Sequence, residues 1–324
     1  MTAIKLLLAT ALASAAGLVT AHAQDYPNRP ITLIVVTAPG GGNDVIGRVL
    51  AERMGRNLGQ QIVVENRPGA GGTLGTRQLA RSEPDGYTLA IGNTGTLTQA
   101  PAVYPNAGYD VRKDFAPIGL IADAPLVMAI NASVPAKSIG DIIGLAKQDP
   151  GKLTYASGGA GTPSHLTGEL FGLMGGVKLT HVPFRGTGPA MTDLIAGRVT
   201  MIFAGLPATI GSIRAGTMRA LAMTSVKRVR ALPEVPTIAE AGLAEFEASQ
   251  RYGLIAPAGT PPAIVAKLNA ALREALKSDD VKARIETDGA EPMPSSPEEY
   301  ARDIDREETK WSRVVRESGA QVKQ

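Results

Sequence analysis

Residues 31–58 read ITLIVVTAPGGGNDVIGRVLAERMGRNL, and this stretch contains the unit from which the fold is built. Its first six residues are apolar and mostly β-branched, as expected of a strand that is buried on both faces. A turn with three consecutive glycines follows, and from residue 45 to 58 apolar side chains recur at the spacing of an amphipathic helix. The stretch therefore predicts a strand, a glycine-rich loop and a helix, in that order.

The same alternation of apolar runs and helical patterns continues along the chain. Further strands are predicted at residues 62–65, 87–91, 118–121, 126–130, 153–156, 178–182, 199–203, 221–224 and 252–257. Further helices are predicted at residues 73–81, 138–148, 164–174, 189–196, 261–277 and 297–317. Strands that alternate with helices of this length indicate βαβ units, so we expect an α/β fold with a mostly parallel sheet. With 324 residues the chain exceeds one ordinary core, so two domains are expected.

The amino-terminal segment, residues 1–23, is predicted to be a secretory signal peptide. Lys5 precedes an apolar run, and Ala21-His22-Ala23 has the small-x-small pattern of a cleavage site, so cleavage is expected after Ala23. No later apolar run approaches the ~20 residues of a membrane-spanning helix. The chain has no cysteine, which excludes a lipid-anchored lipoprotein, a disulfide scaffold and thiol chemistry. We therefore expect a periplasmic protein.

Charge and aromatic content argue against a nucleic-acid-binding protein. The formal net charge is only +3, and aromatic residues make up 4% of the chain. The basic residues are spread along the sequence and form no stripe that could follow a phosphate backbone.

Four loops rich in glycine, serine and threonine lie between a predicted strand and the next helix. They read TAPGGGND at 37–44, GNTGT at 92–96, SGGAGTPSH at 157–165 and PFRGTGP at 183–189. A helix N-terminus has unpaired backbone N–H groups and a partial positive charge, and glycine lets a ligand approach that backbone closely. In open α/β sheets, ligands bind at these carboxyl ends of strands. Helix capping explains any one of these loops, but four of them in one chain favour an anion-binding site. The candidate ligand-binding residues in the second and fourth loops are Asn93, Thr94, Arg185 and Gly186.

Three features have a structural interpretation that we weigh beside the functional one. Asp44 fits a helix cap better than a ligand contact. His165, on the first turn of a helix, fits capping or packing better than ligand contact. The charged residues of the last helix are interpreted as a solvated face: Glu298, Glu299, Arg302, Arg306 and Lys310.

Sequence motifs of common enzyme classes do not occur. The chain contains neither G-x-G-x-x-G nor G-x-x-x-x-G-K-[ST], and Ser157 lacks the first glycine of a G-x-S-x-G elbow. His165 and His181 are the histidines beyond residue 23, and they have no carboxylates at metal-ligand spacing. We expect no catalytic metal, no cofactor and no enzyme; an exported hydrolase on an α/β scaffold is the disfavoured alternative.

The chain also resembles a known family over the whole length after residue 23. The matching runs are NRPGAGGTLG at 66–75, PDGYTL at 84–89, GAGTPSHL at 159–166, VPFRG at 182–186, LPEVPTIAE at 232–240 and APAGTP at 256–261. These runs strongly resemble the tripartite tricarboxylate transporter receptor family, whose members are also called Bug-type solute-binding proteins.

The resemblance implies a two-lobed periplasmic-binding (Venus flytrap) fold of type II, with each lobe a mostly parallel sheet flanked by helices. Two strand crossings near residues 124 and 245 would divide it into a first lobe of 24–124 plus 245–324 and a second lobe of 125–244. The resemblance further implies that the glycine loops at 37–44 and 157–165 grip a carboxylate through backbone N–H groups and ordered waters. On this chain the implied ligand-binding residues are Ala38, Pro39, Gly40 and Gly41 in one loop and Ser157, Gly158, Gly161, Thr162 and His165 in the other. Thr37, which opens the first of these loops, is a further candidate.

Two departures from the family pattern bear on the ligand. Thr37 stands where relatives commonly have an aromatic residue, and Arg251 stands where they commonly have tryptophan. Our hypothesis is that Arg251 brings a cation near the cleft mouth for a more polar or bulkier ligand, such as a di-acid or a substituted aromatic acid. The alternative is that Arg251 lies on the solvent side.

The expected function is capture of a small carboxylate (a di- or tricarboxylate, an acidic amino acid or an aromatic acid) for uptake. The resemblance implies the permease subunits of a tripartite tricarboxylate transporter as partners. The alternative is a ligand sensor that presents the bound carboxylate to a sensor kinase. A monomer is expected, and the identity of the ligand stays open because recognition by backbone groups leaves little trace in a sequence.

Overall fold

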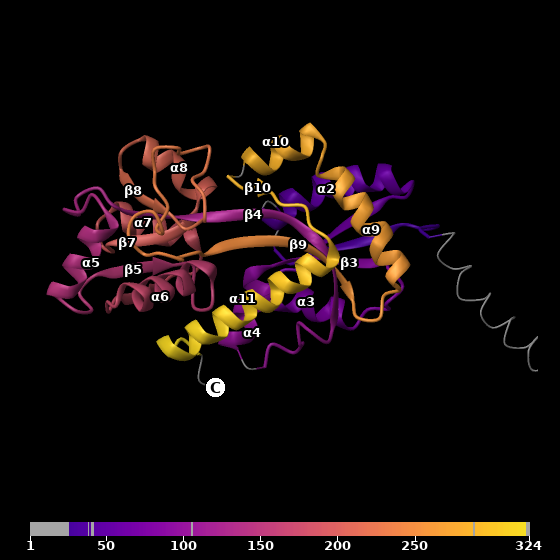
Figure 1. Cartoon of the computed structure of the whole chain (residues 1–324), viewed down its shortest axis with the longest axis horizontal. Helices are drawn as coiled ribbons and strands as arrows, with labels where there is room; N and C mark the ends of the chain where they lie inside the picture. The colour runs from indigo at the N-terminus through magenta and orange to yellow at the C-terminus, as the bar shows by residue number, and fades with distance from the viewer. Residues whose placement is uncertain (1–25, 38, 40–41, 105, 288, 322–324) are drawn as a thin grey trace, which may run out of the picture.

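The structure is a computed structural model and describes residues 26–37, 39, 42–104, 106–287 and 289–321. The predicted signal peptide, residues 1–23, lies outside the described residues. Two groups of elements lie side by side and are joined by two long strands, β4 and β9 (Figure 1). The strands are β1 (Ile31–Val35), β2 (Ile62–Asn66), β3 (Thr88–Asn93), β4 (Phe115–Asn131), β5 (Thr154–Ser157), β6 (Thr180–Pro183), β7 (Met201–Gly205), β8 (Met218–Met223), β9 (Ser249–Pro257) and β10 (Glu291–Pro292).

The predicted helices are present in the structure. The short elements η1, η2 and α4 and the helix α10, which follows α9, were not predicted. The helices are α2 (Gly42–Leu58), η1 (Ala70–Gly72), α3 (Thr73–Ala80), η2 (Gly95–Gln99), α4 (Ala100–Val103), α5 (Ile139–Gln148), α6 (Pro163–Gly175), α7 (Thr187–Ile195), α8 (Leu206–Arg214), α9 (Pro262–Ala275), α10 (Asp279–Thr287) and α11 (Pro297–Ser318). Within the described part of the chain, every helix is too short or too polar to cross a membrane.

The first lobe is built on the strand order β2-β1-β3-β9-β4. Strand β1 pairs in parallel with β2 and β3, so that Leu33 lies opposite Val64 on one side and Leu89 on the other. Strand β9 is antiparallel to both β3 and β4. The loops that follow β1 and β3 therefore leave the sheet at the same edge, as in other parallel sheets.

The second lobe repeats this arrangement with the strand order β4-β7-β5-β6. Strand β5 is parallel to β6 and β7, whereas β4 is antiparallel to β7 and β8. The mostly parallel α/β sheet predicted for each lobe is thus present, with antiparallel strands where the lobes meet.

Strand β4 belongs to both lobes. Its first part pairs with β9, from Phe115 opposite Pro257 to Pro125 opposite Ser249, and its second part pairs with β7 and β8. The prediction of two separate strands at 118–121 and 126–130 is therefore wrong. The apolar pattern breaks between them because Asp123 faces an ion cluster instead of the core. Pro125 lacks an N–H group but keeps the backbone extended.

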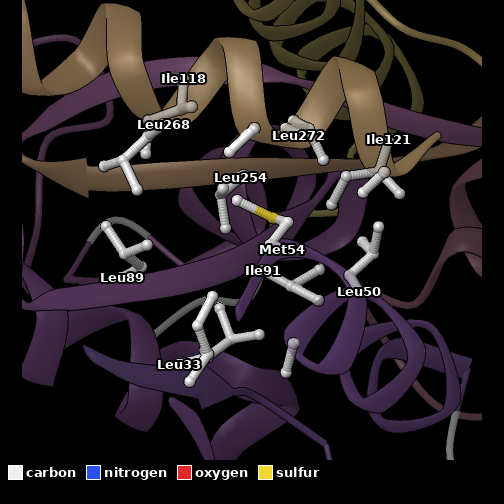
Figure 2. Close-up of a cluster of buried hydrophobic side chains, with 14 of the residues drawn as sticks. Leu33, Leu50, Met54, Leu89, Ile91, Ile118, Ile121, Leu254, Leu268 and Leu272 are labelled. Atoms are coloured by element: carbon white, nitrogen blue, oxygen red, sulfur yellow. The ribbon is translucent and has the colours of Figure 1, made fainter. Parts of the chain in front are cut away.

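The core of the first lobe holds its loops in place. Side chains of the sheet point toward those of α2 and α9, which cover it (Figure 2). Leu50 and Met54 of α2 are one helical turn apart and are at most 2% exposed. Leu268 and Leu272 of α9 have the same spacing and are fully buried. Truncating one such side chain costs roughly 2–5 kcal/mol, so this core is a rigid base for the loop after β1.

Helix α11 runs from the first lobe to the second (Figure 1). Its start is fixed by a capping box in which Ser296 and Glu299 each accept from the backbone N–H of the other. Near its end, Trp311 is fully buried in the core that also contains Phe171 of α6. The last helix thus contributes to the core of the second lobe, and the lobe boundaries near residues 124 and 245 stay a prediction.

The charged face of α11 is mostly as predicted. Glu298, Glu299, Arg302 and Arg306 are exposed. Lys310 differs, because its side chain is only 19% exposed and its Nζ lies 2.7 Å from a carboxylate oxygen of the buried Glu307. The helix is therefore amphipathic, but part of its charge is turned inward.

Candidate functional site

A cavity of about 790 Å³ lies between the two lobes. The first lobe contributes Thr37 from the loop after β1 and Asn93 from the end of β3. The second lobe contributes the loop after β5, from Gly158 to Pro163. Gln250 of the crossing strand β9 also lines the cavity. A larger groove of about 850 Å³ lies on the surface along α2 and the edge strand β2, and none of the predicted site residues lines it.

The loop after β1 is anchored on its outer side. The backbone oxygen of Thr37 accepts from Asn66 Nδ2 at 3.0 Å, and Asn66 Nδ2 is also 2.8 Å from Asp44 Oδ1. Asp44 in turn pairs with Arg48, one turn further along α2, at 3.0 Å, and does not line the cavity. Thr37 lines the cavity, and its hydroxyl is buried with no hydrogen-bond partner among the described residues.

Asn93 is held at the cavity by its neighbours. Its Nδ2 donates to Asn43 Oδ1 at 3.1 Å, and its Oδ1 accepts from the Thr96 N–H at 3.0 Å. These bonds tie the end of β3 to the first turn of α2. The adjacent Thr94 is directed away from the cavity, because its Oγ1 accepts from the Arg251 N–H at 2.9 Å on the hinge side.

The loop after β5 is shaped by hydrogen bonds of its own. The N–H of Gly158 donates to Ser164 Oγ at 3.2 Å, and the N–H of Gly161 donates to His165 Nδ1 at 3.1 Å. Gly159 and Gly161 have φ values of 127° and 75°, which favour glycine. The loop is therefore preorganised, and a ligand anion would have to share these two N–H groups with their partners in the loop.

A buried polar cluster lies beneath this loop. Ser157 Oγ is 2.6 Å from His181 Nε2, and the rings of His165 and His181 stack with centroids 4.0 Å apart. Tyr155 stacks on His181 at 4.9 Å, and its hydroxyl donates to Glu169. Burial and the neighbouring His181 lower the pKa of His165 to about 4, and burial lowers the pKa of His181 to about 4. Both imidazoles are therefore neutral at neutral pH.

The contact between Ser157 and His181 has the geometry of a serine and its base. The Ser157 side chain is fully buried and does not line the cavity. A serine nucleophile has to reach the carbonyl of its substrate, which this position prevents. The pair serves instead to hold the loop on the sheet, since Ser157 Oγ also accepts from the Gly159 N–H at 3.1 Å.

The loop after β6 braces the loop after β5 from behind. The N–H of Gly186 donates to the Gly158 oxygen at 3.2 Å, and the N–H of Phe184 donates to the Ser157 oxygen at 3.0 Å. Arg185 is exposed and does not line the cavity.

The structure thus brings some of the predicted site residues together and separates others. The predicted residues that line the cavity are Thr37, Asn93, Gly158, Gly161 and Thr162. Those that are described and do not line it are Pro39, Thr94, Ser157, His165, Arg185 and Gly186. The predicted residues Ala38, Gly40 and Gly41 lie outside the described residues.

Sequence reasoning missed part of the cavity. The turn from Pro68 to Thr73 and Arg77 of α3 line it, as do Tyr104 and Gln250. The turn had a usable signal, because Gly69, Gly71 and Gly72 precede a helix in the same way as the other glycine loops. Tyr104 and Gln250 had none, since only the approach of the two lobes brings them to the site.

Tyr104 makes a contact across the cleft. Its hydroxyl donates to the Ala160 oxygen at 3.2 Å, and the ring packs on Gly161, where a Cβ would come within 3.1 Å of it. Gln250 lies at the other end of the interlobe space and also lines a second cavity of about 340 Å³, next to α2 and α8.

Both interpretations of Arg251 prove wrong. Its side chain is neither at the cleft mouth nor on the solvent side, because it is 6% exposed and lies between β9 and α11. Its guanidinium is 2.8 Å from a carboxylate oxygen of Glu307 and 3.3 Å from one of Asp303, and it also pairs with Glu247 and, at 3.9 Å, with Asp123. The replacement of the family's tryptophan suggested the cleft, but α11 packs over this part of β9 and encloses the side chain.

Comparisons with known proteins agree with this geometry. Residues 46–320 match the family model described as the tripartite tricarboxylate transporter family receptor. The protein BugT of Bordetella pertussis is 38% identical over 324 residues, which cover 100% of this chain and 99% of the relative.

Solved structures of similar proteins have the same fold. A protein of R. palustris with adipate is 37% identical, with a TM-score of 0.79 over 91% of this chain and 99% of that chain. MatC from Rhodopseudomonas palustris with bound malate is 36% identical, with a TM-score of 0.76 over 90% of this chain and 100% of that chain. The periplasmic binding protein BugD is 36% identical, with a TM-score of 0.76 over 91% and 99%. This chain belongs to the tripartite tricarboxylate transporter receptor family of periplasmic solute-binding proteins.

Proposed function

We propose that the protein captures a small carboxylate in the 790 Å³ interlobe cavity and presents it to the permease subunits of a tripartite tricarboxylate transporter. The observation that carries this proposal is the composition of the cavity wall. Glycine-rich loops from both lobes face one space, and no described residue that lines it carries a negative charge. A cavity of this size falls within the range that small-molecule sites occupy, roughly 300–1,000 Å³.

The binding mechanism would use fixed dipoles in place of a salt bridge at the loops. The Thr37 hydroxyl and the Asn93 amide lie on the first lobe, and the backbone of Gly158, Gly161 and Thr162 lies on the second. Closing the lobes around a carboxylate would remove its water, and the donors would replace that hydration. Because both lobes contribute donors, binding would favour the closed form, which a membrane partner can recognise. The adipate and malate in the related structures are both carboxylates, which supports this ligand class.

The residues that do not line the cavity would have supporting roles. Ser157 and His165 would hold the loop after β5 in its shape, and Gly186 would brace it from behind. Thr94 would connect the end of β3 to the hinge. The hinge itself would be the pair of crossings near residues 124 and 245, where β4 and the segment leading into β9 pass between the lobes.

A thermal-shift screen of the chain that follows Ala23, after unfolding and refolding to remove ligand, tests the ligand class. The panel holds mono-, di- and tricarboxylates, acidic amino acids and aromatic acids, each beside its neutral amide. A ligand present at 100 times its dissociation constant should add ~2.7 kcal/mol to the free energy of unfolding. We expect at least one acid to stabilise the protein while its amide does not. If no acid in the panel does so, the proposed function is wrong.

A variant tests whether Thr37 takes part. Thr37→Val keeps the shape of the side chain and removes the hydroxyl, and a hydrogen bond to a charged group contributes about 1.5–3 kcal/mol. We therefore expect affinity for the best acid of the screen to fall by about 10-fold or more. Thr287→Val, on the exposed end of α10, is the matched control and should leave the affinity unchanged. Equal affinities of Thr37→Val and the unmodified protein would remove Thr37 from the site.

A further inference from the structure

Arg77 is the charged side chain in the interlobe cavity. It belongs to α3, whose first residue, Thr73, also lines the cavity. Among the described residues that line this space, Arg77 is the one whose side chain carries a formal charge. No sequence motif pointed to it, and the glycine loops of the proposed carboxylate site are contributed by other elements.

Among the described residues, the guanidinium of Arg77 has no anionic partner. Its Nη2 donates to Thr73 Oγ1 at 3.3 Å, and its Nε is buried with no hydrogen-bond acceptor in the described part of the chain. Within that part, no carboxylate lies within 4.0 Å of it. An arginine has five N–H donors, so most of the donor capacity of this side chain is unused.

Two other arginines of the protein that are buried or half-buried have several oxygen partners within the protein. Arg219 gives its guanidinium to the backbone oxygens of Ala132, Val134 and Ala136, at 3.2, 3.2 and 2.7 Å. Arg251 is surrounded by carboxylates. Partly burying a cation without such partners is unfavourable, so the position of Arg77 is explained best by an anion that the cavity receives from solution.

The stem of Arg77 packs against the backbone of Gly108. Gly108 has a φ of 83°, and a Cβ at this position would lie 2.5 Å from Arg77 Cδ. The absence of a side chain at Gly108 therefore leaves the room that the stem occupies. Tyr109, which follows, has its pKa raised by burial and so is neutral beside the cation, and its hydroxyl donates to the Thr96 oxygen.

We propose that Arg77 is a specificity-determining residue that binds the second anionic group of a dianionic ligand. This inference rests on the proposed function, in which the glycine loops take the first carboxylate. A planar guanidinium matches a carboxylate with two parallel hydrogen bonds. A ligand with a neutral distal group leaves this cation unpaired in a desolvated cavity, so the cavity selects dicarboxylates against monocarboxylates of the same length.

The test compares each dicarboxylate with its own monoamide on the same protein. The probes are succinate, glutarate and adipate and the three corresponding monoamides, and the dissociation constants are measured by isothermal titration calorimetry. For the unmodified chain we expect the best dicarboxylate to bind at least about 10-fold more tightly than its monoamide. In Arg77→Gln, which keeps the stem, this ratio should fall to within about threefold of unity, because the affinity for the dicarboxylate is lost and that for the monoamide is kept.

Two further variants separate charge from fold. Arg77→Lys keeps the positive charge but loses the paired N–H donors of the guanidinium. Its ratio of dicarboxylate to monoamide affinity should therefore lie between those of the unmodified chain and Arg77→Gln. Arg81→Gln, on an exposed position of the same helix segment, is the matched control and should keep the original ratio. Because the ratio is taken within one protein sample, a partly unfolded fraction does not change it.

The outcomes distinguish this inference from the proposed function. If the unmodified chain binds no probe and no acid of the thermal-shift panel, the proposed function fails and this inference fails with it. If acids bind but the unmodified chain does not discriminate against the monoamide, the inference alone is overturned. The inference alone is also overturned if Arg77→Gln retains the original ratio, whether both affinities are unchanged or both are weakened equally.

Discussion

Arg251, between β9 and α11, is buried and Arg77, in the cleft, is half-buried, and their surroundings are opposite. Arg251 lies between β9 and α11 with four carboxylates in ion-pair range, from Glu247, Asp123, Asp303 and Glu307. Arg77 lines the interlobe cavity, and within the described part of the chain its guanidinium bonds one oxygen, the hydroxyl of Thr73.

The difference separates a charge that the fold has already paired from one that is left for a ligand. Burial raises the pKa of Asp123 and the pKa of Asp303. Burial acts in the same direction on Glu307, but the neighbouring Lys310 and Arg251 outweigh it and lower the pKa of Glu307. Removing Arg251 should therefore disturb folding, while removing Arg77 should disturb recognition. A cation within the interlobe region is thus not by itself a sign of ligand contact.

The largest expected effect, and the clearest way to break this comparison, is Arg251→Met. Taking one partner out of a buried ion cluster leaves uncompensated charge, which costs roughly 3–5 kcal/mol. Urea unfolding measures the loss. Arg112→Met is the matched control, because Arg112 pairs with Asp305 and Glu308 of the same helix but is half exposed, so it should cost at most ~1 kcal/mol.

The same measurement on Arg77→Gln completes the contrast. We expect its free energy of unfolding to stay within about 0.5 kcal/mol of that of the unmodified chain. A loss below ~1 kcal/mol in Arg251→Met, or a loss of several kcal/mol in Arg77→Gln, would show that the two arginines do not differ as the structure indicates.

The next effect is the pH dependence of stability from the histidine pair under the loop after β5. The pKa of each histidine falls from 6.5 to about 4 on folding, so between these values the unfolded chain binds more protons than the folded one. The free energy of unfolding should therefore decrease as the pH falls from about 6.5 to about 4. Above about pH 6.5 these two groups contribute no slope.

Unfolding in urea at pH 7, 6 and 5 measures this slope. His181→Gln serves as the comparison, since its carboxylates titrate as in the unmodified chain and one histidine is absent. The slope should be smaller in the variant. Identical slopes would mean that His181 is not buried in its neutral form. The result sharpens the comparison between Arg251 and Arg77, because the polar groups of the histidine cluster, like those around Arg251, find their partners within the protein.

The smallest effect is expected from Tyr104→Phe. The substitution removes the bond from the Tyr104 hydroxyl to the Ala160 oxygen, a contact across the cleft that contributes about 1 kcal/mol. The affinity for the best acid of the screen should fall by about fivefold, since the closed form loses this contact. Tyr87→Phe is the control, because its hydroxyl bonds Asn28 away from the cleft. No difference between the two variants would show that the Tyr104 contact does not favour closure.

Much of the fold and part of the site could be predicted from local patterns. Apolar periodicity identified β1, α2 and most other elements, because burial of a strand or of one helix face requires that periodicity. The glycine loops at 37–44 and 157–165 were expected at the site because the carboxyl ends of parallel strands share one edge of a sheet. Within the second loop, the family resemblance selected Gly158 and Thr162, which line the cavity. The division of β4 into two strands was wrong, since the charged residue in its middle is satisfied by a partner distant in sequence.

The sequence by itself determined the alternation of strands and helices, the glycine-rich turns at the strand ends and the family. These depend on neighbours within a few residues, whose propensities and spacings are visible along the chain. Only the tertiary structure decided which charges are paired and which are available. Arg251 is enclosed because α11 returns across the hinge, and Arg77 lines the cavity because α3 lies where the loop after β5 approaches. Electrostatic surroundings depend on distance in space, and a folded chain brings together charges that its sequence keeps far apart.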